Sequence, residues 1–115
     1  GFPMSAYSDY LRSSAALLLR EAETLKADDR LDEANHCRIR SNIFDVCATV
    51  ISVFEKRYNA AQAKAAYAAK LAEFETSWRA SMEQSAAHGD AEKASVEAQK
   101  LAALADIKAH YAEME

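Results

Sequence analysis

The sequence predicts an all-α protein, specifically a four-helix up-and-down bundle. Of the 115 residues, 26 are alanine, the best helix former, whereas only two are glycine and one is proline. Neither helix-breaking residue occurs between Met4 and His88. β-Rich and βαβ chains need frequent turn residues, so both classes are close to excluded. Half of the residues are hydrophobic and the net charge is only −4, which excludes a disordered chain.

The first two predicted helices cover residues 5–27 and 30–57. Asp29 is the predicted N-cap of the second helix. The second helix carries an arc of apolar side chains that is wide enough to contact more than one neighbouring helix. The first helix has one core stripe, with spacings of three and four residues: Tyr7, Leu11, Ala15, Leu18, Ala22 and Leu25. The centre of the arc on the second helix consists of Ile39, Ile43, Val46, Cys47, Val50 and Phe54.

A turn at Tyr58 and Asn59 is predicted before the third helix, residues 60–87. Asn59 followed by Gln62 resembles a capping box. The alternative is one uninterrupted helix of about 60 residues and roughly 85 Å. The third helix has a bulky face and, beside it, a line of small residues that lets another backbone come close. The bulky face consists of Tyr67, Leu71, Phe74, Trp78 and Met82; the line, which we call the alanine seam, consists of Ala61, Ala65, Ala68 and Ala72.

The fourth predicted helix covers residues 91–114 and follows the clearest break in the chain. Gly89 suits the position just after the third helix, and Asp90 suits the N-cap of the fourth. Lys100 and Lys108 lie near the apolar stripe of this helix, so we expect it to be peripheral. Residues 5–115 are predicted to form one domain, and residues 1–4 are interpreted as a disordered segment or as residues left by cloning.

Two of the predicted turns resemble the turn of a tetratricopeptide helical hairpin. The first is residues 28–34 with the preceding Leu18, Ala22 and Leu25, and the second is residues 88–94. The two turns are 60 residues apart, whereas that family repeats every 34 residues. The resemblance therefore concerns the turn alone, and it implies no family membership and no binding residues.

The bulk composition argues against several classes of partner. The isoelectric point is near 5.4 and the basic residues are scattered, which argues against nucleic acid. The longest uncharged apolar run, residues 46–54, is too short to cross a bilayer. Cys37 and Cys47 are about 15 Å apart along one helix, too far for a disulfide. Two free thiols and the lack of a signal-peptide pattern in the N-terminal residues indicate a cytoplasmic location.

The densest polar stretch lies at the start of the second helix and contains a candidate polar cluster. Glu33 and His36 form one E-x-x-H motif, whereas ferritin-like di-metal bundles use two. A metal-binding or hydrolytic site would add Asp106 and His110. Because the second and fourth helices of such a bundle run parallel, these pairs should lie at opposite ends. The simpler interpretation is a solvated helix end with ordinary surface pairs, and a buried structural polar network is a third alternative. The cluster consists of Asp32, Glu33, His36 and Arg40.

No catalytic group emerges from the remaining residues. His36 and Cys37 are neighbours, so on a helix they point about 100° apart. Cys47 lies in the apolar arc, where a thiol is inert. A ligand pocket at Tyr67 and Trp78 is a further alternative, but it has no polar anchors. We therefore expect no enzyme, no metal and no cofactor.

The predicted helices carry more apolar faces than a single bundle core can cover. The wide arc on the second helix and the alanine seam on the third both need a neighbour. Uncovered apolar surface usually marks an interface. We therefore expect a non-catalytic interaction or structural module that self-associates or binds another helical protein, with neither nucleic acid nor membrane as partner.

Overall fold

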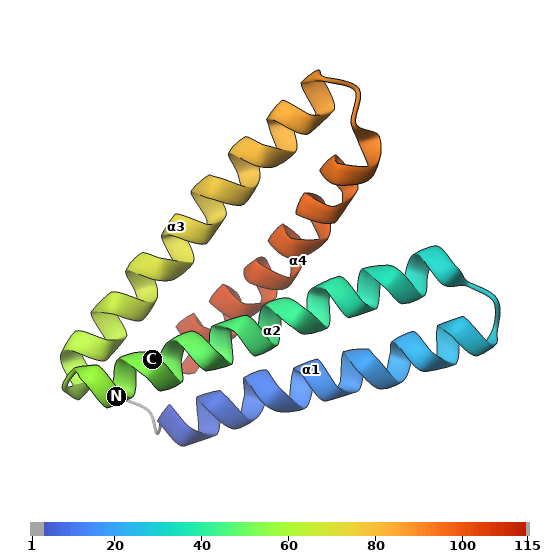
Figure 1. Cartoon of the computed structure of the whole chain (residues 1–115). Helices are drawn as coiled ribbons and strands as arrows, with labels where there is room; N and C mark the ends of the chain where they lie inside the picture. Colours follow the sequence, from blue (N-terminus) through green and yellow to red (C-terminus); the bar gives the residue numbers. More distant parts are fainter. Residues whose placement is uncertain (1–3, 115) are drawn as a thin grey trace.

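Two antiparallel helical hairpins, joined in sequence, make up the up-and-down four-helix bundle (Figure 1). The structure is a computed structural model, and it describes residues 4–114. Each helix begins and ends within one residue of its predicted bounds, although a helix-breaking residue, Gly89, stands at only one of the three turns. Residues 1–4 are predicted to be disordered or left by cloning. Met4 instead begins the first helix, and residues 1–3 lie outside the described part of the chain. The helices are α1 (Met4–Ala27), α2 (Leu31–Arg57), α3 (Ala60–Ala87) and α4 (Ala91–Met114).

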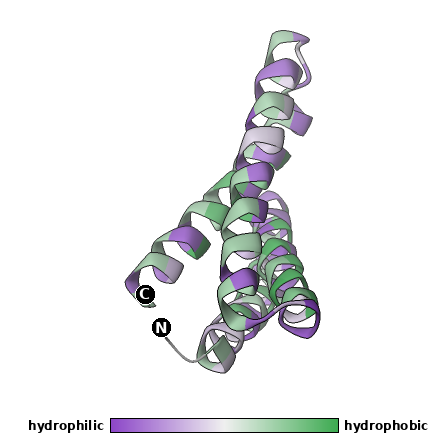
Figure 2. Ribbon diagram, turned by 90° about the vertical axis from the view of Figure 1, so that its left-hand side faces the viewer, coloured by the Kyte–Doolittle hydropathy of each residue, from purple (hydrophilic) through white to green (hydrophobic). Residues whose placement is uncertain are grey.

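The two hairpins meet near the α2–α3 turn and diverge toward the other two turns (Figures 1 and 2). Their shared core therefore lies in the half of the molecule where all four helices are close. A smaller cluster of Ala22, Ala34 and Cys37 fills the outer part of the α1–α2 hairpin. The shared core contains Tyr7, Leu11, Ala15, Ile43, Phe44, Cys47, Ala48, Ile51, Tyr67, Leu71, Ala103, Leu104, Ile107 and Tyr111.

Helix α4 is central, so the prediction that it is peripheral is wrong. It contacts each of the other three helices. The two lysines near its apolar stripe do not prevent this, because their amines reach acids at the edge of the core. Lys108 Nζ lies 2.6 Å from Glu75 Oε1 on α3, and Lys100 Nζ lies 2.8 Å from Glu97 Oε1. Helix α2 also contacts all three other helices, as its wide apolar arc predicts.

Both hairpin turns use the same backbone geometry. The Arg30 N–H donates to the Leu25 carbonyl at 2.9 Å, and the Asp90 N–H donates to the Ser85 carbonyl at 2.8 Å. The preceding residue is left-handed in each turn, Asp29 with φ 60° and Gly89 with φ 76°. Gly89 thus has its predicted role.

The caps of the helices follow the sequence at two of three sites. The Asp90 carboxylate accepts the Lys93 N–H at 3.0 Å, which confirms its N-cap role. Asn59 and Gln62 form the predicted capping box, so the single long helix is wrong. The prediction that Asp29 caps α2 is wrong. The cap residue is Arg30, whose side chain makes no capping bond, because Asp29 is used as the left-handed residue.

At the two left-handed positions, removing a glycine and introducing one should change the free energy of unfolding in opposite directions. Gly89→Ala should lower the free energy of unfolding by about 1 kcal/mol, since an L-residue is strained there. A Cβ at residue 89 meets no atom within 4 Å, so the backbone alone sets this cost. Asp29→Gly should raise the free energy of unfolding by up to about 1 kcal/mol for the same reason. Urea titrations of both variants test this, and equal shifts of the same sign would contradict it.

Candidate functional site

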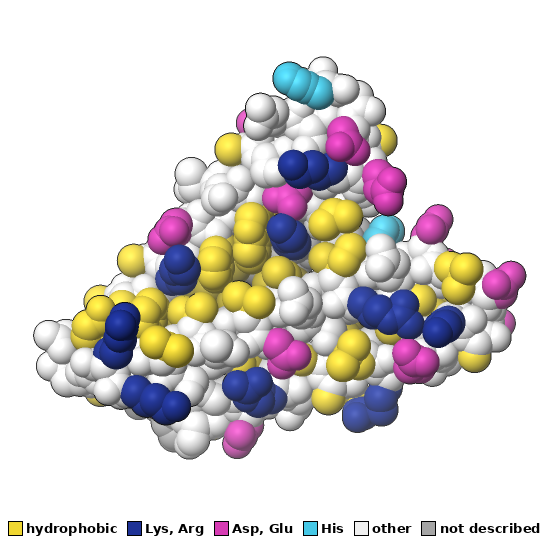
Figure 3. Space-filling view, in the orientation of Figure 1, with side chains coloured by type: hydrophobic (Ala, Val, Ile, Leu, Met, Phe, Trp, Pro, Cys, Tyr) yellow, Lys and Arg dark blue, Asp and Glu magenta, His cyan; other side chains and the backbone are white. Residues whose placement is uncertain are grey.

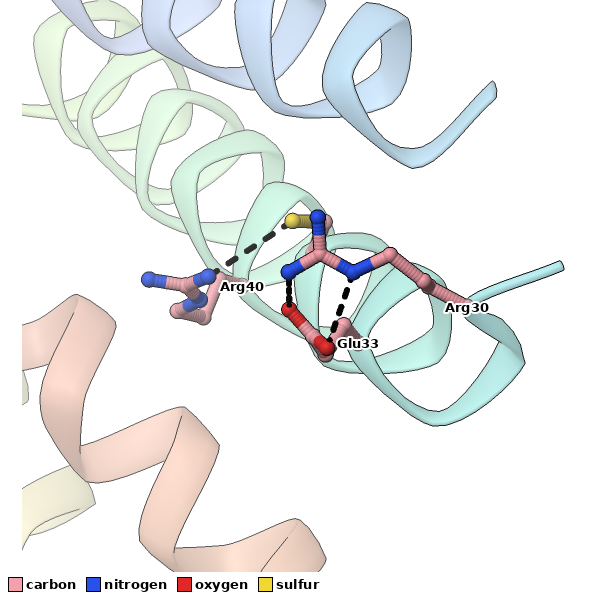
Figure 4. A network of polar contacts seen from close by, with 4 residues as sticks. Arg30, Glu33 and Arg40 are labelled. Atoms are coloured by element: carbon pink, nitrogen blue, oxygen red, sulfur yellow. Dashed lines mark hydrogen bonds and ion pairs between the residues drawn. The ribbon is translucent and has the colours of Figure 1, made fainter. Parts of the chain in front are cut away.

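The four residues of the candidate polar cluster lie in three different surroundings. Glu33 forms a bidentate pair with Arg30 at the exposed start of α2 (Figure 4). Asp32 and His36 line the cleft between the diverging hairpins. Arg40 extends from α2 on the side that faces α4 (Figure 4). The Glu33–His36 motif is thus divided between an ion pair and a cleft.

The cleft between the hairpins has a volume of about 540 Å³. Helix α2 contributes Asp32 and His36 to it, and α4 contributes Glu92 and Ser95. His36 is half-buried there. The cleft is polar and acidic at its rim, and it joins the first turns of two parallel helices.

Asp106 and His110, the other two residues of the metal hypothesis, lie toward the opposite end of α4. They line a pocket with residues of α1 and α2, and His36 is not among its lining residues. The His110 ring stacks on Tyr10 with centroids 3.5 Å apart and planes inclined by 3°. Within residues 4–114, no group of three or more His, Cys, Asp or Glu side chains is placed to hold a metal ion.

The pocket that contains Arg40, Asp106 and His110 has a volume of about 440 Å³, and we call it the Arg40 pocket. The sequence pattern groups Arg40 with Asp32 and His36, which lie one to two turns earlier on the same face of α2. The i, i+4 spacing of Asp106 and His110 was the only signal of a shared surface. The sequence does not predict that residues of α1 line this pocket beside Asp106 and His110, because that depends on how the two hairpins cross.

Three buried tyrosines from three helices form a closed group in the shared core. Tyr7, Tyr67 and Tyr111 contact one another edge to face, with centroids 5.1 to 5.6 Å apart. The Tyr7 and Tyr67 hydroxyls share a hydrogen bond of 2.6 Å. Cys47 on α2 interacts with the Tyr67 hydroxyl, so every helix contributes one side chain. We call these four residues the tyrosine layer.

Burial sets the chemistry of the tyrosine layer. It raises the pKa of both Tyr7 and Tyr67 above the ordinary range, and it raises the pKa of the Cys47 thiol to about 12. The thiol is therefore protonated at neutral pH and unsuited to nucleophilic attack. Cys37 is also free and buried, and it accepts a weak bond from Arg40. The layer holds the helices together and offers no reactive group.

The suggested ligand pocket at Tyr67 and Trp78 does not assemble. Tyr67 is fully buried in the tyrosine layer and has no surface to offer. Trp78 is half-buried and stacks on Phe74 at 4.8 Å between centroids. Lys100 Nζ lies 5.3 Å above the Trp78 ring. These two rings line the inner side of the α3–α4 hairpin as packing residues.

Several apolar surfaces remain uncovered. All four residues of the alanine seam on α3 are exposed. Figure 3 shows hydrophobic side chains gathered in the angle between the hairpins. Among larger side chains, Leu17 and Leu31 are each 58% exposed. Of the two apolar faces that the sequence singled out, the arc on α2 packs against the other helices, whereas the alanine seam on α3 is exposed.

Comparison of the chain with protein-family models, with curated proteins and with solved structures found no match. None of the four helices, over the part of the chain that is described, is long and apolar enough to cross a membrane.

Proposed function

We propose that the protein is a non-catalytic helical interaction module that self-associates through the alanine seam of α3. The observation that carries the proposal is that Ala61, Ala65, Ala68 and Ala72 are all exposed. Exposed alanine side chains are small, so each buries little apolar area in a contact. Their small size also lets the backbone of this helix approach a second helix closely. Since Cys37 and Cys47 are free thiols, we place the module in the cytoplasm.

A second copy of the chain fits the seam because the seam is self-complementary. Its spacings of four, three and four residues are the same in both directions along the helix. In an antiparallel pair, Ala61 therefore meets Ala72 of the second copy, and Ala65 meets Ala68. Such a pairing closes with twofold symmetry and uses the same surface on both copies. Tyr58, 42% exposed and three residues before the seam, adds apolar area at each end.

The distance between spin labels tests this arrangement. Ala80 is exposed on α3, outside the seam, and can be labelled as Ala80→Cys because both native cysteines are buried. It lies 13.5 residues from the symmetry axis, so the two labels should be about 40 Å apart. A parallel pair would instead bring them within about 10 Å. Dilution with unlabelled protein should remove the signal, and a labelled sample without any intermolecular signal would overturn the proposal.

A further inference from the structure

The Arg40 pocket combines an apolar wall with charges of both signs. Leu17 and Leu18 of α1 and Phe44 of α2 form the apolar part. Arg40 provides the positive charge, and Asp106 and Glu113 of α4 provide two negative charges. Because three helices from both hairpins line this open pocket, it exists only in the assembled bundle.

Arg40 is poorly satisfied by the protein. Its Nε is buried and makes no hydrogen bond to any residue in the range 4–114. Its Nη2 donates to Cys37 Sγ at 3.6 Å, and sulfur is a weak acceptor. No ion pair within the described residues includes it, whereas its neighbour Arg38 is paired with Glu23 at 3.2 Å. A buried guanidinium donor of this kind favours an acceptor such as a carboxylate.

The carboxylates lie on the α4 side of the same pocket, near Tyr10. Burial raises the pKa of Tyr10, and the charges of Asp106 and Glu113 raise it further. Tyr10, Asp106 and Glu113 all line the same pocket. The stacked His110 ring covers the face of Tyr10 beside them. This side of the pocket favours a cationic group, and the Arg40 side favours an anionic one.

The charges exclude the simpler classes of ligand. A simple anion would bind Arg40 but would lie in the same pocket as two carboxylates. A simple cation would give the Arg40 guanidinium no negatively charged partner. We propose that the Arg40 pocket binds a small zwitterion of the amino-acid type, with its carboxylate on Arg40 and its ammonium group toward Asp106 and Glu113. Its apolar body packs on Leu17, Leu18 and Phe44.

Three probes with the same phenylethyl body test the proposal. L-Phenylalanine carries both charges, 3-phenylpropionate only the carboxylate, and 2-phenylethylamine only the ammonium group. The ring resonances of Tyr10 and His110 report binding at this pocket by nuclear magnetic resonance titration. L-Phenylalanine should bind about tenfold more tightly than either singly charged probe, since each charge adds a charge-assisted contact. No shift with any probe, or equal affinity for 3-phenylpropionate, would overturn the proposal.

Matched variants assign each charge to its end of the pocket. Arg40→Gln should remove the advantage of L-phenylalanine over 2-phenylethylamine. Asp106→Asn with Glu113→Gln should remove its advantage over 3-phenylpropionate. Arg38→Gln removes a positive charge from the same helix, outside the pocket, and should leave all three affinities unchanged. Circular dichroism confirms that each variant is folded, and unchanged L-phenylalanine binding by folded Arg40→Gln would refute the assignment.

Discussion

Replacing Tyr67 with alanine should strongly destabilise the bundle. The expected loss is about 3–5 kcal/mol of the free energy of unfolding, because the change opens a large cavity in the core. Tyr67 is fully buried, contacts the rings of Tyr7 and Tyr111, and shares a hydrogen bond with Tyr7. Domains of this size have a free energy of unfolding of only about 5–15 kcal/mol, so this loss is a large share of the total stability. Urea denaturation followed by circular dichroism measures the loss.

Two controls separate the ring from its hydroxyl. Tyr67→Phe keeps the ring and should cost about 1–2 kcal/mol, the effect of losing a buried hydrogen bond. Tyr7→Phe combined with Tyr67→Phe should cost less than the sum of the single changes, because both remove the same bond. Tyr58→Ala alters a tyrosine that is 42% exposed and should cost about 0.5 kcal/mol or less. Equal losses for Tyr67→Ala and Tyr58→Ala would contradict the role of the tyrosine layer.

Introducing glutamate into the alanine seam should abolish self-association without unfolding the chain. In the antiparallel pair, residue 65 of one copy meets residue 68 of the other. Ala65→Glu with Ala68→Glu therefore brings four carboxylates together at the centre of the contact. Like-charge repulsion of this kind should raise the dissociation constant by about a hundredfold or more. Glutamate is a good helix former, so α3 should remain intact.

An exposed alanine outside the seam provides the control for this experiment. Ala16 lies on the exposed face of α1. Ala16→Glu adds one negative charge per copy and should leave the dissociation constant almost unchanged. Sedimentation of the seam variant and the Ala16 variant at matched concentrations compares them. A seam variant that stays associated, or an Ala16 variant that dissociates equally, would place the contact elsewhere.

The helices could be predicted from the sequence because their stop signals are local. Gly89, Asp90 and the Asn59–Gln62 capping box each act within a few residues of their own position. Asp29 was misjudged because aspartate suits both an N-cap and a left-handed residue. Only the neighbouring backbone bonds distinguish the two roles.

The arrangement between helices could be predicted only in part. Each tyrosine of the layer lies on a core stripe that the sequence shows, but their meeting depends on the relative register of three helices. The lysines of α4 predict a peripheral helix; Glu97 is an i, i+3 neighbour of Lys100 that the sequence shows, whereas the pairing of Lys108 with Glu75 depends on how α3 packs on α4. Arg40 was grouped with Asp32, although eight residues place them about 12 Å apart along α2. At that distance they face different neighbours across diverging hairpins.

The molecular mass of the unmodified protein in solution shows directly whether the chain self-associates. Sedimentation equilibrium from low micromolar to millimolar concentration should show a reversible rise from 12.7 kDa per chain to twice that mass. The rise should be absent in the Ala65→Glu, Ala68→Glu variant. A constant mass of 12.7 kDa for the unmodified chain at every concentration would contradict self-association through α3.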